Sequence, residues 1–459
     1  MVARLDWPRW GWALGLAGTA APLGLLVGFD PALAILVALS AAFALIAFTN
    51  LAHGLALYMF VSFIALPPFG LYDAMARLLL ALTWFAVVAT KRERELEFPA
   101  VHPLMAVAML LFVGWAAISV VWAEDAAKAL ESATYYALSV ILLLIVFTAV
   151  RTVEDLRPVL LAFVAGCVVA TLYGVSGSTE EGERLATAVL DPNLLAAALV
   201  AGVALSIGLL ALYRSPPIRL ALLPSGVLLA VAIWLTTSRS ALVAVAVCLV
   251  AAIVLAGRWR PQMLVASLAA VTLTYFYFAG VASDQARERI SEPFSGQERT
   301  TDGRSTIWQL ALRAFDDRPV TGVGAGNFPV VSVHYLLEPG VERGLEQIID
   351  DPKRKVAHST YLSVLSELGI VGIVLFSFVV VSSLGAAIGA ARRFGAGGEW
   401  RLQIASVSIV VALIGVLTVS VFQSDPYGKQ LWLLLALGPA MLAIAKRDRA
   451  GRLGPPPGR

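Results

Sequence analysis

The chain has 459 residues, of which 59% are hydrophobic and only 14% are charged, and its mean hydropathy is +0.82. Such a composition excludes an ordinary soluble domain and predicts an integral membrane protein. The net charge of +3 is small and the basic residues are scattered over short loops, so nothing indicates nucleic-acid binding. The two cysteines, Cys167 and Cys248, both lie in apolar runs and are too few for a disulfide framework or a metal cluster.

Apolar runs of about 17–25 residues recur along the chain, the length that a helix needs to cross a bilayer, and they lack the alternation of a barrel. The first 30 residues have the charge order of a signal peptide but no small-residue cleavage site before a soluble domain, so we interpret them as the first span. The candidate spans are 10–29, 31–48, 52–66, 72–90, 103–122, 132–150, 158–175, 189–213, 218–236, 240–256, 262–280, 359–388, 401–423 and 429–445. Because the early, closely spaced pairs also suit re-entrant segments, we expect an all-α polytopic bundle of about 12–14 transmembrane helices.

Lys and Arg gather in six connections between these spans, and short basic loops stay on the cytoplasmic side of a membrane. Counting spans between them puts all six on one side, with both termini inside. The six connections are 91–97, 151–157, 213–219, 257–261, 391–401 and 446–459.

Four parts of the chain follow from this topology. We expect residues 1–280 to form the first part of the transmembrane bundle, 281–357 a large periplasmic loop, and 358–445 the C-terminal transmembrane helices. The tail, 446–459, is rich in Gly, Pro and Arg and is predicted to be cytoplasmic and disordered.

The large loop contains an amphipathic pattern in "RSTIWQLALRAFDDRP". Ile307, Leu310, Ala311, Ala314 and Phe315 recur at helical spacing, which predicts a helix that ends before Pro319. We expect this helix to lie on the membrane surface or to cap the bundle.

His358 stands where the large loop returns to an apolar segment. An imidazole can accept a proton near neutral pH, which suits a general base acting on a hydroxyl. A hydrogen-bonded interfacial histidine at a helix start is an equal alternative on position alone. His334, in the plain stretch "VVSVHYLLEPG", is interpreted as an ordinary loop residue.

Three arginines are predicted on the same side of the membrane as His358. Arg239 stands in the short turn "TTSRSA", close to hydrocarbon, where an ionised side chain is expensive and usually functional. Arg184 precedes a span that opens with Asp-Pro-Asn193, and Arg304 opens the amphipathic helix. Guanidinium groups bind phosphate oxygens bidentately, so convergence of the three would make a pyrophosphate site. Contact with lipid headgroups, or salt bridges to carboxylates of the loop, is the alternative.

The stretch "TGVGAGNF" at 321–328 has glycine spacing similar to that of a nucleotide-binding loop. Because no strand precedes it and no Lys-Ser/Thr follows, we interpret it as a structural turn. The exoplasmic loops also lack an Asp-x-Asp or Glu-x-Asp pair, so we expect a mechanism without a metal or another cofactor.

Four stretches together resemble the O-antigen ligase/polymerase superfamily of polytopic glycosyltransferases. The most specific is the last, because the family reads His-Asn there, then Tyr-Leu, then Glu-x-Gly. This chain keeps His358, Tyr361, Glu367 and Gly369 but has Ser359 in place of the asparagine. The resemblance covers residues from about 180 to 375, in "ERLATAVLDPNLLA", "TTSRSALVA", "GRSTIWQLALRAFDDRPVTGVGAGNF" and "AHSTYLSVLSELGIVGI".

The resemblance implies a fold of the GT-C type and metal-independent, inverting glycosyl transfer on the periplasmic face of a bacterial inner membrane. The donor would be a glycan on undecaprenyl pyrophosphate. In a ligase the acceptor is a sugar of lipid A-core, whereas in a polymerase it is a second lipid-linked glycan. The modest loop favours the ligase slightly, and a transporter of lipid-linked glycans is disfavoured because the charged candidates gather at one interface rather than at the bilayer midplane.

Each candidate residue then has an expected role. His358 would be the catalytic base, Arg184 and Arg239 would hold the pyrophosphate, and Arg304 would assist them or order the loop. The remaining family residues, Asn193, Tyr361 and Glu367, would support the site, with Glu367 bracing its helix rather than reacting.

Overall fold

The computed structural model describes residues 25–64, 69–90, 97–176, 184–187, 190–291, 302–336 and 356–453. All regular structure within these ranges is helical, which confirms the predicted all-α class. The helices are α2 (Pro31–Thr49), α3 (Leu51–Val61), α4 (Phe69–Thr90), α5 (Phe98–Val101), α6 (Pro103–Ile118), α7 (Ala126–Ala149), α8 (Val153–Ser176), α9 (Pro192–Leu212), α10 (Pro216–Leu235), α11 (Arg239–Leu255), α12 (Arg260–Phe276), α13 (Asp284–Ser291), α14 (Asp302–Asp317), α15 (Phe328–Leu336), α17 (Thr360–Ala396), α18 (Trp400–Val419) and α19 (Lys429–Leu453), with short 3-10 or π turns at Ser119–Val121, Gly257–Trp259 and Tyr277–Val281.

The helices of the described residues match the predicted spans closely. Ten are long and apolar enough to cross a bilayer, and three shorter apolar helices lie at Leu51–Val61, Ala76–Thr90 and Arg239–Leu255. Each predicted span from 31–48 onward coincides with one of them, whereas most of the first, 10–29, lies outside the described residues. The protein is therefore a polytopic all-α membrane protein.

Two of these spans begin with the same sequence signal, an aspartate N-cap followed by a proline. Asp30 caps α2 and Asp191 caps α9, each accepting hydrogen bonds from backbone N–H groups of the first turn. A proline, Pro31 or Pro192, occupies the first helical position after each cap. Because the first N–H groups of a helix have no partner within it, a capping oxygen followed by proline fixes where a helix begins.

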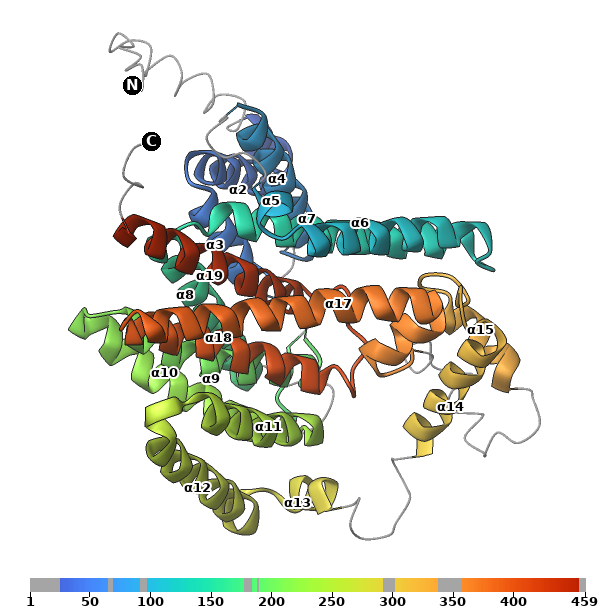
Figure 1. Cartoon of the computed structure of the whole chain (residues 1–459). Helices are drawn as coiled ribbons and strands as arrows, with labels where there is room; N and C mark the ends of the chain where they lie inside the picture. The colour runs from blue at the N-terminus through green and yellow to red at the C-terminus, as the bar shows by residue number, and fades with distance from the viewer. Residues whose placement is uncertain are drawn as a thin grey trace.

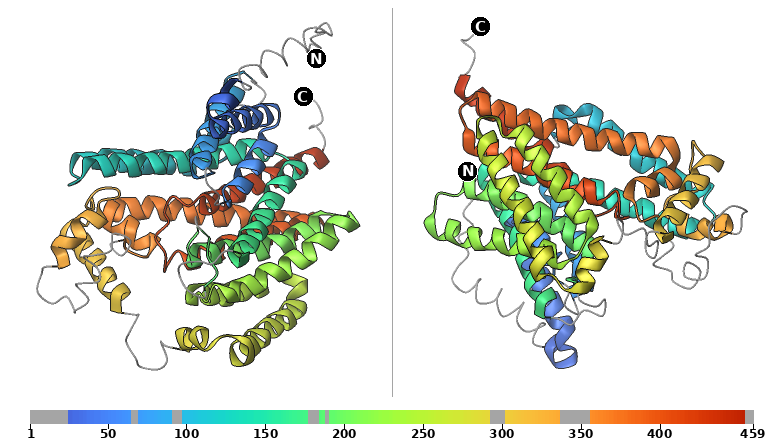
Figure 2. Two further views of the ribbon diagram at one scale, coloured as in Figure 1. Left: turned by 180° about the vertical axis from the view of Figure 1, so that it is seen from behind. Right: turned by 90° about the horizontal axis from the view of Figure 1, so that it is seen from below.

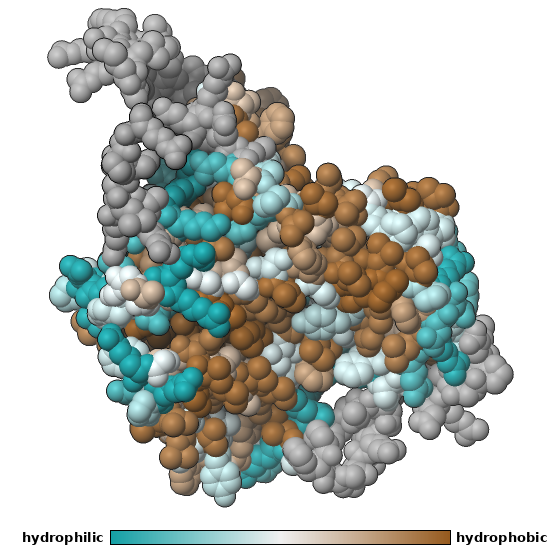
Figure 3. Space-filling model, viewed as in Figure 1, coloured by the Kyte–Doolittle hydropathy of each residue, from teal (hydrophilic) through white to brown (hydrophobic). Residues whose placement is uncertain are grey.

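The centre of the bundle is formed by α9, α18 and α19, with α17 packed along α18, α19 and α6 (Figure 1). The indole of Trp432 on α19 is fully buried there. By contrast, α12 has no buried side chain and lies at the periphery, as the views from behind and below also show (Figure 2). Figure 3 shows hydrophobic side chains across the middle of one face and hydrophilic ones toward its two ends, as expected for a bundle that crosses a bilayer.

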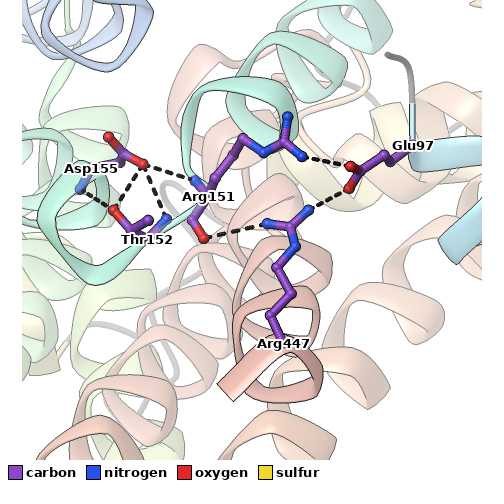
Figure 4. Close-up of polar contacts among 5 residues, drawn as sticks. All are labelled: Glu97, Arg151, Thr152, Asp155 and Arg447. Atoms are coloured by element: carbon purple, nitrogen blue, oxygen red, sulfur yellow. Dashed lines mark hydrogen bonds and ion pairs between the residues drawn. The ribbon is translucent and has the colours of Figure 1, made fainter. Parts of the chain in front are cut away.

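One end of the bundle gathers the predicted cytoplasmic connections. Glu97 binds Arg151 at 2.5 Å and also binds Arg447, whose guanidinium donates to the Arg151 carbonyl at 3.3 Å (Figure 4). Arg157 donates to the carbonyl of Leu212 at 3.1 Å, which adds the connection after α9. Trp259 and Trp400, which follow α11 and α17, line one pocket.

The structure corrects the predicted span at 359–388, which is not one continuous helix. Gly369 has φ 65° and ψ −164°, far from helical values, and divides α17 into two pieces. We call the first piece, residues 360–368, the tip helix. The second piece continues to Ala396 and alone is long enough to cross a bilayer, at 1.5 Å per residue.

The segment 319–326, here called the glycine loop, holds the two pieces of α17 at this break. The N–H groups of Val323 and Gly324 donate to the carbonyls of Ser366 and Glu367 at 3.0 and 2.9 Å. Ile370 N–H, at the start of the second piece, donates to the Pro319 carbonyl at 2.8 Å. The loop thus satisfies backbone groups that a helix break leaves open, which confirms its interpretation as a structural turn.

We predict that Gly322→Ala destabilises the protein by about 2–4 kcal/mol, because an alanine pays about 1–2 kcal/mol for a left-handed backbone and its Cβ would overlap the backbone of Glu367. Gly322 has φ +65°, whereas Gly385 on the second piece of α17 has open space around it. Gly385→Ala is therefore the control and should be neutral or slightly stabilising. Thermal unfolding in detergent compares the two, and equal Tm values would contradict the close packing of the glycine loop on α17.

A second prediction concerns Glu97, whose side chain is 40% exposed. Burial opposes its ionisation, but the hydrogen bonds and charges of Arg447 and Arg151 outweigh burial and lower its pKa below 4.5. A lowered carboxyl pKa stabilises the fold above the unfolded value and loses that effect as pH falls through the folded value. Glu97→Gln should therefore lower Tm at pH 7 by an amount that corresponds to about 1 kcal/mol or less, and the difference should disappear in acid, as pH falls through the lowered pKa of Glu97.

The matched control for Glu97→Gln is Glu154→Gln, because Glu154 is mostly exposed and only approaches Arg157, at 4.0 Å. It should leave Tm unchanged at both pH values. A Glu97→Gln effect that persisted in acid would show that the side chain acts by packing rather than by charge.

Candidate functional site

At the end of the bundle away from Glu97, α14 and α15 lie beside the tip helix (Figure 1). Ile307, Leu310, Ala311 and Ala314 of α14 are buried in a small apolar cluster with α15, which confirms the predicted amphipathic helix. Trp308 stacks on Phe422, with ring centroids 6.2 Å apart. The predicted amphipathic helix therefore caps the bundle.

Arg184 is held at the turn between α10 and α11. Its Nε donates to the carbonyl of Thr236 at 3.1 Å and lies 3.2 Å from Oγ1 of Thr237. One terminal nitrogen lies 3.4 Å from Oδ1 of Asn193, which also accepts a hydrogen bond from Ser238 at 2.8 Å. The predicted residues Arg184 and Asn193 are thus in direct contact, next to the residue before Arg239.

Arg304 and Arg239 belong to the same cluster of charges. Burial lowers the pKa of Arg304, and the nearby guanidinium groups of Arg239 and Arg289 lower it further, while Asp191 acts in the opposite direction. Asp191 also caps the helix that carries Asn193. We call the group of Arg184, Arg239, Arg304 and Asp191 the arginine cluster, and its members come from the segment before α9, the N-cap of α9 and the first turns of α11 and α14.

His358 precedes the tip helix, whose first turn is fixed to the loop between α18 and α19. Ser359 is the N-cap, its Oγ accepting from Leu362 N–H at 3.4 Å, while its own N–H donates to Ser424 Oγ at 3.0 Å. The family's usual asparagine and the serine found here are both strong N-caps, so the substitution keeps the capping function.

Gln423 connects the tip helix to the arginine cluster. Its side-chain amide donates to Asp191 Oδ2 at 2.9 Å, and its carbonyl accepts a hydrogen bond from Thr360 Oγ1 at 2.8 Å. Two hydrogen bonds therefore link the residue that caps α9 to the second residue after His358. Sequence reasoning missed Gln423, and the polar run "QSD" between two apolar spans was the available signal.

Two residues of the candidate site have a strained backbone. Among the described residues, Thr237 and His358 are the non-glycine residues with positive φ, at 45° and 47°. Such a backbone costs about 1–3 kcal/mol per residue and persists where the surroundings enforce it, often at functional sites. Thr237 contacts Arg184, and His358 is the candidate base.

The remaining candidates hold the tip helix or lie elsewhere. Tyr361 donates its hydroxyl hydrogen to the Leu417 carbonyl at 2.9 Å, and buried Glu367 accepts from Gly326 N–H at 2.8 Å. Both contacts fix the tip helix to its neighbours. His334 lies on α15, mostly exposed, 3.7 Å from Glu124 and outside the arginine cluster.

Two further charged groups lie near the site and were missed. Asp425 N–H donates to Thr360 Oγ1 at 3.0 Å. Burial raises the pKa of Asp425 to about 6, with Asp191 acting in the same direction and Lys429 and Arg77 opposing. Arg77 lies in α4, far from the family motifs in sequence, so only the folded chain shows that it faces this loop.

One comparison with known proteins found a match over part of the chain. Residues 224–377 match the family model described as O-Antigen ligase. The matched segment contains Arg239, Arg304, His358 and Glu367, whereas Arg184 lies before it. The search of curated proteins gave no match. Within the described residues, no group of three or more His, Cys, Asp or Glu is placed to hold a metal ion.

We predict that Asp425 makes the stability of the protein depend on pH. The pKa of Asp425 is about 6 in the folded chain and 3.8 in the unfolded chain, so its stabilising effect is complete below pH 3.8 and is lost as pH rises through 6. The loss amounts to at most about 3 kcal/mol. Tm should therefore fall between pH 4 and 7 by less in Asp425→Asn than in the wild type, while the exposed Asp284→Asn should behave as wild type. An unchanged pH profile in Asp425→Asn would contradict the raised pKa.

Proposed function

We propose that this chain, whose residues 224–377 match the O-antigen ligase family model, is a membrane glycosyltransferase of the ligase type. It transfers a glycan from undecaprenyl pyrophosphate to a sugar hydroxyl of lipid A-core on the periplasmic face of the bacterial inner membrane. The observation that carries the proposal is the arginine cluster, joined through Asp191 and Gln423 to the segment that presents His358.

The arginine cluster suits the pyrophosphate of the donor. Arg184, Arg239 and Arg304 come from three separate segments and gather at one end of the bundle. Guanidinium groups bind phosphate oxygens in pairs, and fixed positive charge stabilises the negative charge that develops as pyrophosphate leaves. These side chains supply the charge that a divalent cation supplies in other glycosyltransferases, so we propose a metal-independent reaction.

His358 acts as the general base in this mechanism. It accepts the proton of the acceptor hydroxyl while the hydroxyl oxygen attacks the anomeric carbon of the donor. The bond from that carbon to the pyrophosphate oxygen breaks, and undecaprenyl pyrophosphate departs with the electron pair. Attack from the face opposite to the leaving group inverts the anomeric centre, and the left-handed backbone of His358 fixes the base for that approach.

The position of the basic connections supports a periplasmic site. Three of them, 91–97, 151–157 and 446–459, meet around Glu97, Arg151 and Arg447 at the end of the bundle away from the arginine cluster. Short loops rich in Lys and Arg remain in the cytoplasm, so the other end, with the tip helix, faces the periplasm.

The proposal is tested with purified protein in nanodiscs with EDTA, an undecaprenyl-pyrophosphate glycan as donor and lipid A-core as acceptor. We predict that His358→Asn lowers kcat/KM by about 10²–10⁴-fold, the contribution of a general base. Asparagine tolerates a left-handed backbone, so this variant should fold, which its Tm verifies. His334→Asn is the matched control and should retain full activity.

The products decide between the possible reactions. Glycan on lipid A-core that requires His358 supports the ligase. Longer lipid-linked glycan formed without lipid A-core would make the protein a polymerase. If the wild type binds the donor but transfers nothing in either format, the transferase proposal is wrong and a transporter becomes the better hypothesis.

A further inference from the structure

We infer that a pocket beside His358 is the binding site for the acceptor saccharide, an inference that rests on the proposed glycosyl transfer. The pocket has a volume of about 280 Å³. Its walls come from α7, the glycine loop and the start of α15, residues 356–357, the tip helix and the loop before α19. This volume is close to the lower end of the range of about 300–1,000 Å³ for small-molecule sites, as suits a sugar unit rather than a lipid chain.

The pocket is adjacent to the candidate base. Ala357, the residue before His358, lines it, and so does Ser424. Ser424 Oγ accepts from Ser359 N–H at 3.0 Å and lies 2.9 Å from Ser363 Oγ, another lining residue. The residue that fixes the start of the tip helix therefore also forms a wall of the pocket.

The pocket and the arginine cluster are distinct sites. Arg184, Arg239 and Arg304 do not line the pocket. The arginine cluster reaches the tip helix through Asp191 and Gln423, whereas the pocket contacts it through Ser363 and Ser424. A base that takes a proton from one substrate while the other loses pyrophosphate must lie between two sites, and the segment at 356–360 has this position.

The lining suits a sugar ring. The Tyr135 and Tyr427 rings have centroids 5.6 Å apart, and both residues line the pocket. Tyr135 donates its hydroxyl hydrogen to Glu131 at 3.1 Å, and both side chains are exposed at the pocket. Aromatic rings pack against the C–H faces of a sugar, while a carboxylate accepts hydrogen bonds from its hydroxyls.

Charge disfavours a second phosphate site. Glu131 and Glu367 both line the pocket, against the single cation Lys128 among its lining residues. The exposed Glu131 carboxylate repels a phosphate but accepts hydrogen bonds from neutral hydroxyls. The pocket therefore fits the hydroxyl-bearing acceptor and not the pyrophosphate of the donor.

The test separates the two substrates in steady-state kinetics of the full-length protein, with lipid A-core as acceptor. Glu131→Gln and Tyr135→Ala should each raise the KM for lipid A-core about 10-fold, which corresponds to about 1.4 kcal/mol of lost binding. The KM for the donor and the kcat at saturating acceptor should change less than about 3-fold. Core oligosaccharide freed from its lipid should compete with lipid A-core in the wild type and compete more weakly in both variants.

Two matched controls accompany the variants. Glu124→Gln removes a carboxylate at the same end of the bundle, and Leu130→Ala shortens an exposed side chain of the same helix, and neither residue lines the pocket. Both controls should keep wild-type KM values. An unchanged acceptor KM in Glu131→Gln and Tyr135→Ala, with transfer still dependent on His358, overturns the acceptor site and leaves the proposed function intact. A raised donor KM also overturns it, and a wild type that transfers nothing rejects both.

Discussion

A helix that breaks inside a membrane protein leaves carbonyl and N–H groups open, and the candidate site depends on how this chain satisfies them. The glycine loop binds the carbonyls of Ser366 and Glu367 and accepts from Ile370 N–H. Only glycine fits at these two positions. A Cβ on Gly322 would overlap the backbone of Glu367, and a Cβ on Gly369 would overlap the carbonyl of Val320. The direction of the tip helix, and with it the location of His358, follows from these hydrogen bonds.

The spans were predictable because bilayer hydropathy is a local property that each segment carries by itself. The break in α17 was not, since "SELGIVGIVLF" continues the apolar run and glycine is common in transmembrane helices. Its cause is tertiary: Glu367 binds Gly326 N–H while Gly369 takes a backbone that other residues avoid. The Glu-x-Gly motif therefore has a structural explanation that becomes visible only when the glycine loop lies beside it.

The residues of the candidate site were likewise only partly predictable from the sequence. Arg239 stood out because a charge next to apolar sequence is expensive, and Arg184 and Arg304 stood out because they precede a span and open the amphipathic helix on the same side. Gln423, Arg289 and Arg77 did not, because their importance lies in partners far along the chain, as in the hydrogen bond from Gln423 to Asp191. A sequence pattern identifies costly residues, whereas the contacts that join them depend on the packing of α9, α14 and α18.

The division of α17 into two pieces also affects how the protein responds to the thickness of the surrounding bilayer. Transmembrane helices change their tilt as the thickness of the surrounding bilayer changes. In α17 such tilting acts on the piece after Gly369, while the tip helix is fixed separately, by the glycine loop on one side and by Ser420 and Gln423 on the other. Because the backbone leaves helical values at Gly369, we expect a change in the tilt of the second piece to be transmitted only weakly to the tip helix.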